Sequence, residues 1–94
     1  MKFHLISDNV DTQKGMRLAG IDGVVVHSPD EVAREIDSCL KDKEIGIILI
    51  TEVLAAMIPS RIDDIRLNMP MPLIVVIPDR HGTKRKSDSI TRYV

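Results

Sequence analysis

Polar and acidic side chains follow the carboxyl ends of several apolar segments in this sequence. They are Ser7, Asp8, His27, Thr51, Glu52 and Asp79. In an open parallel sheet, ligands bind beyond the carboxyl ends of the strands, so these side chains would gather at a binding edge. Carboxylates with one histidine can hold a hard cation such as Mg²⁺. The same residue types also cap helices at strand-to-helix turns, and this second interpretation predicts no site.

Motifs for nucleotide and phosphate chemistry are missing. A phosphate-binding turn needs closely spaced glycines, so that backbone amides can approach the anion. Residues 8–15 offer only Gly15, and neither GxGxxG nor GxxxxGK[ST] occurs in the chain. A receiver domain needs a phosphoacceptor Asp where the third apolar run ends, and Thr51 stands there. We therefore expect neither nucleotide binding nor phosphoryl transfer.

Histidine and cysteine form no recognisable catalytic set. His4, His27 and His81 are spread over the chain, and Cys39 is the single cysteine. A lone cysteine forms no internal disulfide, which is compatible with a reducing compartment. Cys39 borders the apolar stripe of a predicted helix, and we interpret it as half-buried packing rather than as a nucleophile. We predict no catalytic residue, no cofactor and no metal.

Strand and helix signals alternate four times along the 94 residues. An alternating pattern predicts a short strand near residues 3–7, and apolar, β-branched runs predict strands near residues 23–27, 45–50 and 73–77. Two of these runs, Val24–Val26 and Ile47–Ile50, are continuously apolar, so we expect them to be fully buried. Alternation of strands and helices predicts right-handed crossovers and a parallel sheet. The fold prediction is one α/β, Rossmann-like or flavodoxin-like domain, with strand order 2-1-3-4 and helices on both faces.

The clearest helix start is the segment Ser28-Pro29-Asp30-Glu31. Its serine can cap, its proline suits the first helical position, and its glutamate follows three residues after the cap, as in a capping box. Val32 and Ile36 then place apolar side chains on one stripe of the helix. We expect this helix, over residues 28–43, to be the best formed in the chain.

The other helix boundaries depend on single residues. Asp11 or Thr12 can cap the first helix, and Thr51 can cap the third. Pro59 must break the third helix, because proline removes a backbone donor and clashes with the preceding turn. The helix then resumes over residues 60–68.

Charge divides the sequence into two parts. The net charge is −1, but residues 1–78 contain 8 basic and 12 acidic side chains, whereas residues 79–94 contain 5 basic and 2 acidic ones. We predict an α/β core over residues 1–78, followed by a basic loop and the start of a C-terminal helix over residues 79–94. A basic tail on an acidic body suggests a contact surface, and a solvated charged segment is the alternative.

Composition limits the possible partners and location. One Phe, one Tyr and no Trp leave few aromatic faces for stacking on bases, so we expect no nucleic-acid partner. No apolar run approaches the roughly 20 residues of a membrane span, and the N-terminus lacks a signal-peptide pattern. We expect a soluble, cytoplasmic protein.

The segment Thr12-Gln13-Lys14-Gly15-Met16-Arg17-Leu18-Ala19-Gly20-Ile21 resembles a signature of the small central-stalk subunit of V/A-type rotary ATPases, called the F subunit. That signature reads Thr-x-x-Gly-Phe-Arg-Leu-Ala-Gly-Ile. Residues 45–52 and 72–78 are similar to the family's central and last strands, and residues 88–90 to the start of its final helix. The chain departs from the family at Ser7, where glycine is usual, and at Met16, where an aromatic residue is usual. The family's last helix normally continues further, so the resemblance predicts a short or truncated variant.

The resemblance implies a role in the central stalk, or rotor, of the ATPase or ATP synthase. The F subunit binds the coiled-coil shaft, called the D subunit, and rotates with it. It thereby helps to couple ATP hydrolysis or synthesis in the catalytic head to proton or sodium transport. Such a protein is non-catalytic and peripheral to the membrane. The alternative hypothesis is a small regulatory or ligand-binding α/β domain that uses the acidic edge Asp8, Glu52 and Asp79.

The basic tail supplies most candidates for the shaft contact. A helix beginning at Asp88 has barely two turns, and so short a helix needs a surface to pack on. Ile90 and Val94 are four residues apart and align on one stripe of that helix. The candidate interface residues are Arg17, Leu18, Lys84, Arg85, Lys86, Ile90, Arg92, Tyr93 and Val94.

Overall fold

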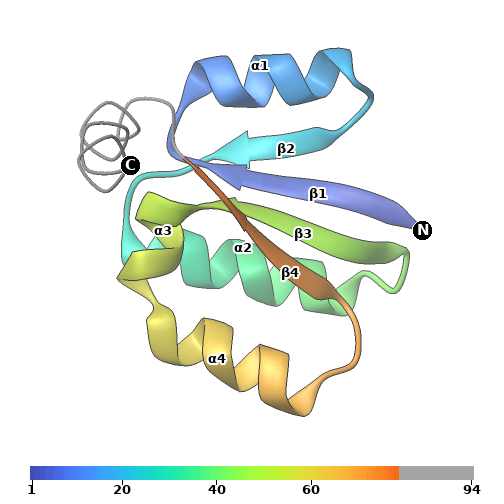
Figure 1. Ribbon diagram of the computed structural model, residues 1–94, viewed down its shortest axis with the longest axis vertical. Helices are drawn as coiled ribbons and strands as arrows, with labels where there is room; N and C mark the ends of the chain where they lie inside the picture. The colour runs from blue at the N-terminus through green and yellow to red at the C-terminus, as the bar shows by residue number, and fades with distance from the viewer. Residues whose placement is uncertain (79–94) are drawn as a thin grey trace, which may run out of the picture.

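Four parallel strands form the sheet of the computed structural model, which describes residues 1–78 (Figure 1). The strands are β1 (Lys2–Ser7), β2 (Asp22–Val25), β3 (Ile45–Thr51) and β4 (Leu73–Ile77). Their order across the sheet is β2-β1-β3-β4, and each neighbouring pair is parallel. The predicted strands, their parallel pairing and their order are confirmed.

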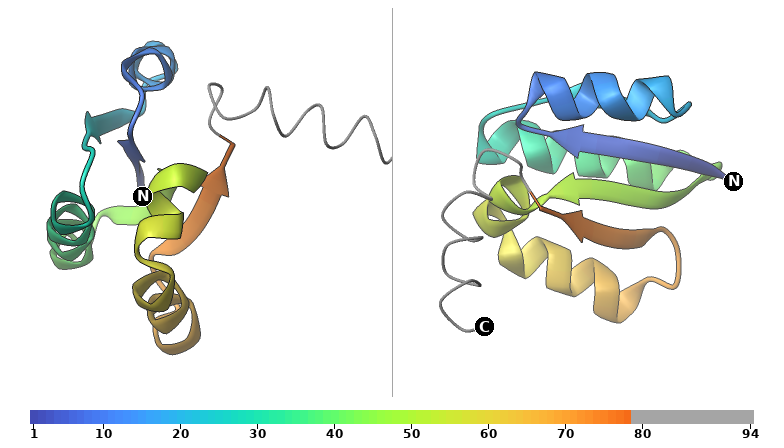
Figure 2. Two further views of the ribbon diagram at one scale, coloured as in Figure 1. Left: turned by 90° about the vertical axis from the view of Figure 1, so that its left-hand side faces the viewer. Right: turned by 45° about the horizontal axis from the view of Figure 1, so that its top comes forward.

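The helices lie on both faces of this sheet, as predicted, but unequally. They are α1 (Val10–Leu18), α2 (Pro29–Lys41), α3 (Glu52–Met57) and α4 (Pro59–Asn68). α1 lies alone on one face, where it packs on β1 and β2, while α2 and α4 lie on the opposite face (Figure 2, left). With right-handed crossovers this division follows from the strand order, because only the crossover from β1 to β2 runs in the opposite direction.

The main core lies between the sheet and the helices α2, α3 and α4. Its most deeply buried side chains, each fully inaccessible to solvent, are Ile6, Val32, Ile36, Ile48, Ile50 and Leu54. Two of them, Val32 and Ile36, are four residues apart on α2, so they lie on one stripe. The predicted break at Pro59 is confirmed, because α3 ends at Met57 and α4 begins at Pro59.

The capping interactions of α2 follow the predicted pattern. Ser28 Oγ accepts a hydrogen bond from the Glu31 amide at 3.3 Å. In return, Glu31 Oε1 accepts from Ser28 Oγ at 3.0 Å and from the His27 amide at 3.3 Å. These bonds to the charged carboxylate, the one from His27 above all, lower the pKa of Glu31 below its usual value. With 13 residues α2 is the longest helix of residues 1–78, although it ends at Lys41 rather than at residue 43.

Two capping predictions are wrong. The first helix is capped by Asn9, whose Oδ1 accepts from the amides of Asp11 at 2.7 Å and Thr12 at 3.3 Å, so α1 begins before both predicted caps. Thr51 precedes α3 but makes no side-chain cap. Its hydroxyl instead donates to Asp8 Oδ1 at 2.8 Å and so joins the ends of β3 and β1.

The predicted full burial of two apolar runs is also only partly right. Val24 and Val25 are half-buried, because β2 is an edge strand of the sheet, and only Val26 is buried. In β3, Ile48 and Ile50 are inaccessible, but Ile47 is half-buried because it faces the side on which α1 lies alone.

Candidate protein-interaction surface

One face of the sheet remains partly open beside α1. Successive side chains of a strand point to opposite faces, so the strand register decides which residues share this face. Phe3, Ile47 and Leu73 are partners across β1, β3 and β4 and form one row. Leu5, Leu49 and Val75 form the next row by the same register. Both rows are entirely apolar.

In both rows the side chain of β4, the strand farthest from α1, is the most exposed. In the second row the exposed fractions are 0% for Leu5, 9% for Leu49 and 36% for Val75. In the first row Phe3 is 44% and Leu73 is 55% exposed. α1 has nine residues, buries none of its own side chains fully and packs on β1 and β2, so it does not reach β4. We call the residues Phe3, Ile47, Leu73, Val75 and Ile77 the uncovered sheet face.

A hollow of about 450 Å³ continues this face toward the carboxyl end of the strands. Its walls are the first turns of α1 on one side and the end of β4 on the other. The lining residues are Asp11, Thr12, Gly15, Met16, Ile77 and Pro78. Gly15 leaves the helix surface open there, since no atom lies within 4 Å of the position that a Cβ would occupy. The groove therefore joins the small and apolar surface of Gly15, Met16, Ile77 and Pro78 to the polar side chains of Asp11 and Thr12.

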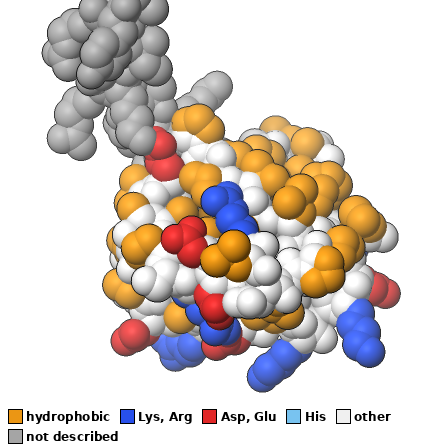
Figure 3. Space-filling view, turned by 60° about the horizontal axis from the view of Figure 1, so that its bottom comes forward, with side chains coloured by type: hydrophobic (Ala, Val, Ile, Leu, Met, Phe, Trp, Pro, Cys, Tyr) orange, Lys and Arg blue, Asp and Glu red, His pale blue; other side chains and the backbone are white. Residues whose placement is uncertain are grey.

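Further apolar side chains lie in the segment that leads into β4. Met69 is 38% and Met71 is 49% exposed. Figure 3 shows hydrophobic side chains gathered at the upper right of this view, and others scattered among the charged side chains of the same face. Contiguous exposed apolar surface of this kind marks interaction sites in soluble proteins.

The interface residues predicted from the sequence are only partly described by the structure. Arg17 and Leu18 lie in the last turn of α1, and both are exposed, Leu18 to 91%. The other seven candidates lie outside the described residues. They are Lys84, Arg85, Lys86, Ile90, Arg92, Tyr93 and Val94. The uncovered sheet face itself was not predicted from the sequence.

At the carboxyl edge of the sheet, the predicted polar residues mainly form hydrogen bonds to other groups of the fold. Ser7 Oγ donates to the Asn9 carbonyl and accepts from the Asn9 amide, both at 2.9 Å. Asp8 accepts from Thr51, as described above. His27 is exposed, and Asp79 lies outside the described residues. Within residues 1–78, this edge holds no three His, Cys, Asp or Glu side chains close enough to share an ion. The geometry favours a structural role over the predicted alternative of a cation site.

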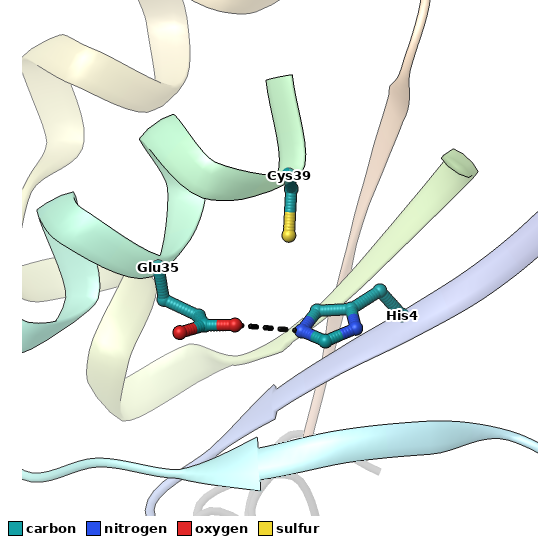
Figure 4. A group of neighbouring side chains, drawn as sticks. All are labelled: His4, Glu35 and Cys39. Carbon is teal, nitrogen blue, oxygen red and sulfur yellow. Dashed lines mark hydrogen bonds and ion pairs between the residues drawn. The ribbon is translucent and has the colours of Figure 1, made fainter. Parts of the chain in front are cut away.

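A different cluster, which the sequence interpretation missed, lies at the amino end of β1. His4 Nε2 is 2.9 Å from Glu35 Oε1, and Cys39 lies beside both on the next turn of α2 (Figure 4). Cys39 is only 2% exposed, which is more burial than the half-burial expected. Burial raises the pKa of its thiol to about 12, and the charges of Glu35 and Asp42 add to that shift. The free thiol is therefore a poor nucleophile at neutral pH.

Comparison with known proteins agrees with the resemblance found in the sequence. The sequence model of the family described as ATP synthase (F/14-kDa) subunit matches residues 4–94. The F subunit of the A-type ATP synthase of Methanothermobacter thermautotrophicus is 33% identical over 85% of this chain and 76% of its own length. The corresponding protein of Methanocaldococcus jannaschii is 30% identical over 100% of this chain and 91% of its own length. That of Thermococcus kodakarensis is 34% identical over 89% and 80%. Because the match spans almost the whole chain, this protein belongs to the ATP synthase (F/14-kDa) subunit family.

Proposed function

We propose that this chain is a non-catalytic central-stalk subunit of an A/V-type rotary ATPase or ATP synthase. In this role it binds the coiled-coil shaft, the D subunit, turns with it, and helps to couple ATP hydrolysis or synthesis in the head to proton or sodium transport. It is a peripheral part of the membrane complex and works on its cytoplasmic side. The observation on which the proposal rests is the family match over residues 4–94.

The described residues are consistent with a binding role. The sequence lacks a phosphate-binding turn. At the carboxyl ends of β1 and β3, Asp8 and Thr51 form a hydrogen bond with each other. None of the helices in residues 1–78 is both long enough and apolar enough to traverse a bilayer. Attachment to the complex would then depend on contacts with its other subunits.

The uncovered sheet face offers a surface for an α-helical shaft. An open β-sheet face stabilises itself by packing against another layer, most often helices. Here the apolar rows Phe3–Ile47–Leu73 and Leu5–Leu49–Val75 have α1 on one side and an open border at β4 on the other. The ridge of a coiled-coil helix packed there would cover side chains that are now 36–55% exposed.

The basic tail and the end of α1 complete the proposed interface. Arg17 and Leu18 end α1 at the edge of the sheet where β1 and β4 begin, because α1 runs antiparallel to the strands. In residues 79–94 we propose that Ile90, Tyr93 and Val94 provide apolar contacts. Lys84, Arg85, Lys86 and Arg92 are proposed to pair with acidic side chains of the shaft. Charges at the rim of an interface chiefly guide encounter and orientation, so we expect the apolar contacts to determine affinity.

The test is capture of a tagged shaft protein by variants of the full chain. Leu73→Glu and Val75→Glu place a carboxylate on the uncovered sheet face, and Ile90→Glu places one in the tail. Burying an unpaired charge in an interface costs several kcal/mol, so each of these variants should weaken capture at least about 100-fold. Leu67→Glu is the matched control, because Leu67 is 84% exposed on α4, away from the proposed surface.

Different outcomes separate the proposed contacts. If only Ile90→Glu weakens capture, the tail alone binds the shaft. If only the Leu73 and Val75 variants do so while their melting temperatures fall, the face is covered within the chain itself. If all three variants capture the shaft as well as the Leu67 control does, both proposed contacts are wrong and Arg17 and Leu18 are tested next. Failure of the unmodified chain to bind any shaft protein would refute the proposed function.

A further inference from the structure

The cluster at the amino end of β1 brings three different metal-binding side chains together. Glu35 and Cys39 are four residues apart on α2, so they lie on the same face of the helix. His4 reaches the same point from β1, on the face that α2 covers (Figure 4). The imidazole nitrogen, the carboxylate oxygen and the thiol sulfur all lie within 4.8 Å of one another.

Asp22 adds a fourth candidate donor beside this group. It is the register partner of His4 on the neighbouring strand β2, so the two side chains point to the same face of the sheet. Both line a hollow of about 280 Å³ together with Glu35, Cys39 and Asp42. The hollow leaves room for a water molecule or for the Asp22 carboxylate to reach an ion held by the other three.

The electrostatics of the hollow favour a cation. Asp22, Glu35 and Asp42 contribute three carboxylates, against the one ammonium group of Lys2. That ammonium is itself paired with Asp42, its Nζ lying 3.2 Å from Asp42 Oδ2. His4 also lines the hollow, and it bonds to Glu35. A bound divalent ion would therefore offset an excess of negative charge.

The donor set and its spacing indicate which ion fits. Imidazole, thiolate and carboxylate together are typical ligands of borderline transition metals, above all Zn²⁺, whereas Mg²⁺ and Ca²⁺ prefer oxygen alone. Tetrahedral Zn²⁺ with a nitrogen and a sulfur ligand needs these atoms about 3.5 Å apart, by the usual bond lengths. The His4 and Glu35 side chains are 18% and 26% exposed, so the rotation that closes separations of up to 4.8 Å would fall on these two side chains.

We propose that His4, Glu35 and Cys39 form a binding site for one divalent transition-metal ion of the Zn²⁺ class, with Asp22 or water as the fourth ligand. On binding, the Cys39 thiol releases its proton to solvent, and His4 keeps its proton on Nδ1 so that Nε2 faces the ion. The site would tie β1 to α2 on the face opposite the uncovered sheet face. It does not depend on shaft binding.

The test uses the metal-free full chain and two metal ions. Titration with Co²⁺ should produce a thiolate-to-cobalt charge-transfer band that saturates at one ion per chain. Equilibrium dialysis with Zn²⁺ should give the same stoichiometry. Cys39→Ser should abolish the charge-transfer band, and His4→Gln and Glu35→Gln should each weaken Zn²⁺ binding by at least about tenfold.

Matched controls are available in the same chain. Glu31→Gln changes a carboxylate one turn earlier on α2, and His27→Gln and His81→Gln remove the other imidazoles, so these variants should bind Zn²⁺ as the unmodified chain does. Circular dichroism establishes that each variant is folded. If Cys39→Ser does not fold, His4→Gln and Glu35→Gln, at partly exposed positions, decide the question. Absence of the charge-transfer band, or unchanged affinity in both of these variants, would show that the cluster is only a His4–Glu35 hydrogen bond beside a buried thiol.

Discussion

The unequal covering of the two sheet faces predicts that two neighbouring strand positions differ sharply in their contribution to stability. Ile48 in β3 faces α2 and is inaccessible to solvent, whereas Leu73 in β4 lies on the uncovered sheet face and is 55% exposed. The perturbation is truncation of each side chain to alanine in the isolated chain. The two substitutions remove side chains of the same size, so they compare the two environments directly.

The expected magnitudes follow from burial. Ile48→Ala removes fully buried atoms and leaves a cavity between the sheet and the helices, which should cost about 2–5 kcal/mol. Complete burial of a leucine contributes about 1.5–3 kcal/mol, and less than half of Leu73 is buried. Leu73→Ala should therefore cost less than about 1 kcal/mol.

The assay is urea unfolding followed by circular dichroism, with the unfolding slope compared among the variants. A cost for Leu73→Ala as large as that for Ile48→Ala would refute the reasoning, because the face would then be covered in the isolated chain. Repeating the measurement at several protein concentrations would then show what packs on the face. A second copy of the chain makes the midpoint depend on concentration, and a segment of the same chain does not.

Further predictions concern backbone space, acid stability and ligand binding. Gly23→Ala should destabilise the fold by about 1–3 kcal/mol, because the added Cβ would lie 2.6 Å from Leu5 Cβ, and urea unfolding measures the cost. Gly15→Ala, inside α1 and with open space around it, should instead stabilise by about 0.5–1 kcal/mol, and a loss of stability would contradict the described groove. Because folding lowers the pKa of Glu31, the contribution of this side chain to the free energy of unfolding is present above its ordinary pKa of 4.5. That contribution is lost as the pH falls through the folded-state pKa. The advantage of the unmodified chain over Glu31→Gln in urea unfolding should thus shrink between pH 7 and about pH 3, and a constant difference would speak against the capping bonds. Calorimetric titration with Mg-ATP up to about 1 mM should show no specific binding, and micromolar binding that Asp8→Ala abolishes would favour the ligand-binding alternative.

The sequence predicted the sheet well because its signals are local. The alternating pattern of β1, the β-branched runs of β2 to β4 and the Ser28 capping box of α2 depend on residues that are close together in the chain. The cap of α1 was harder to predict, because four neighbouring residues are all of types that commonly cap helices: Asp8, Asn9, Asp11 and Thr12. Asn9 rather than Asp8 caps the helix, because β1 ends just before these residues and the Asp8 carboxylate already accepts a hydrogen bond from Thr51 of β3.

The surfaces were not predicted, because they depend on which elements meet across the sheet. Phe3, Ile47 and Leu73 have the same apolar character as core residues, and only the strand register and the reach of α1 leave them open. In the cluster of His4, Glu35 and Cys39, the bonded pair His4 and Glu35 is 31 positions apart. The spacing of Glu35 and Cys39 on one helix was visible in the sequence, but the face on which His4 lies required the fold.

The strand β4 also affects how the chain behaves before assembly. Among the described strands it has one neighbour, β3, so its other edge leaves backbone groups open to pairing with foreign strands. Its sequence, Leu73–Ile77, is uncharged and rich in β-branched residues, the composition that favours aggregation. Pro72 and Pro78 flank it, and a proline cannot donate to a β-ladder, so any intermolecular ladder is limited to this short strand. Arg66 further occupies the carbonyl of Ile74 at 3.2 Å. The chain can therefore keep an apolar strand available for assembly while the flanking prolines act as gatekeepers against fibrous self-association.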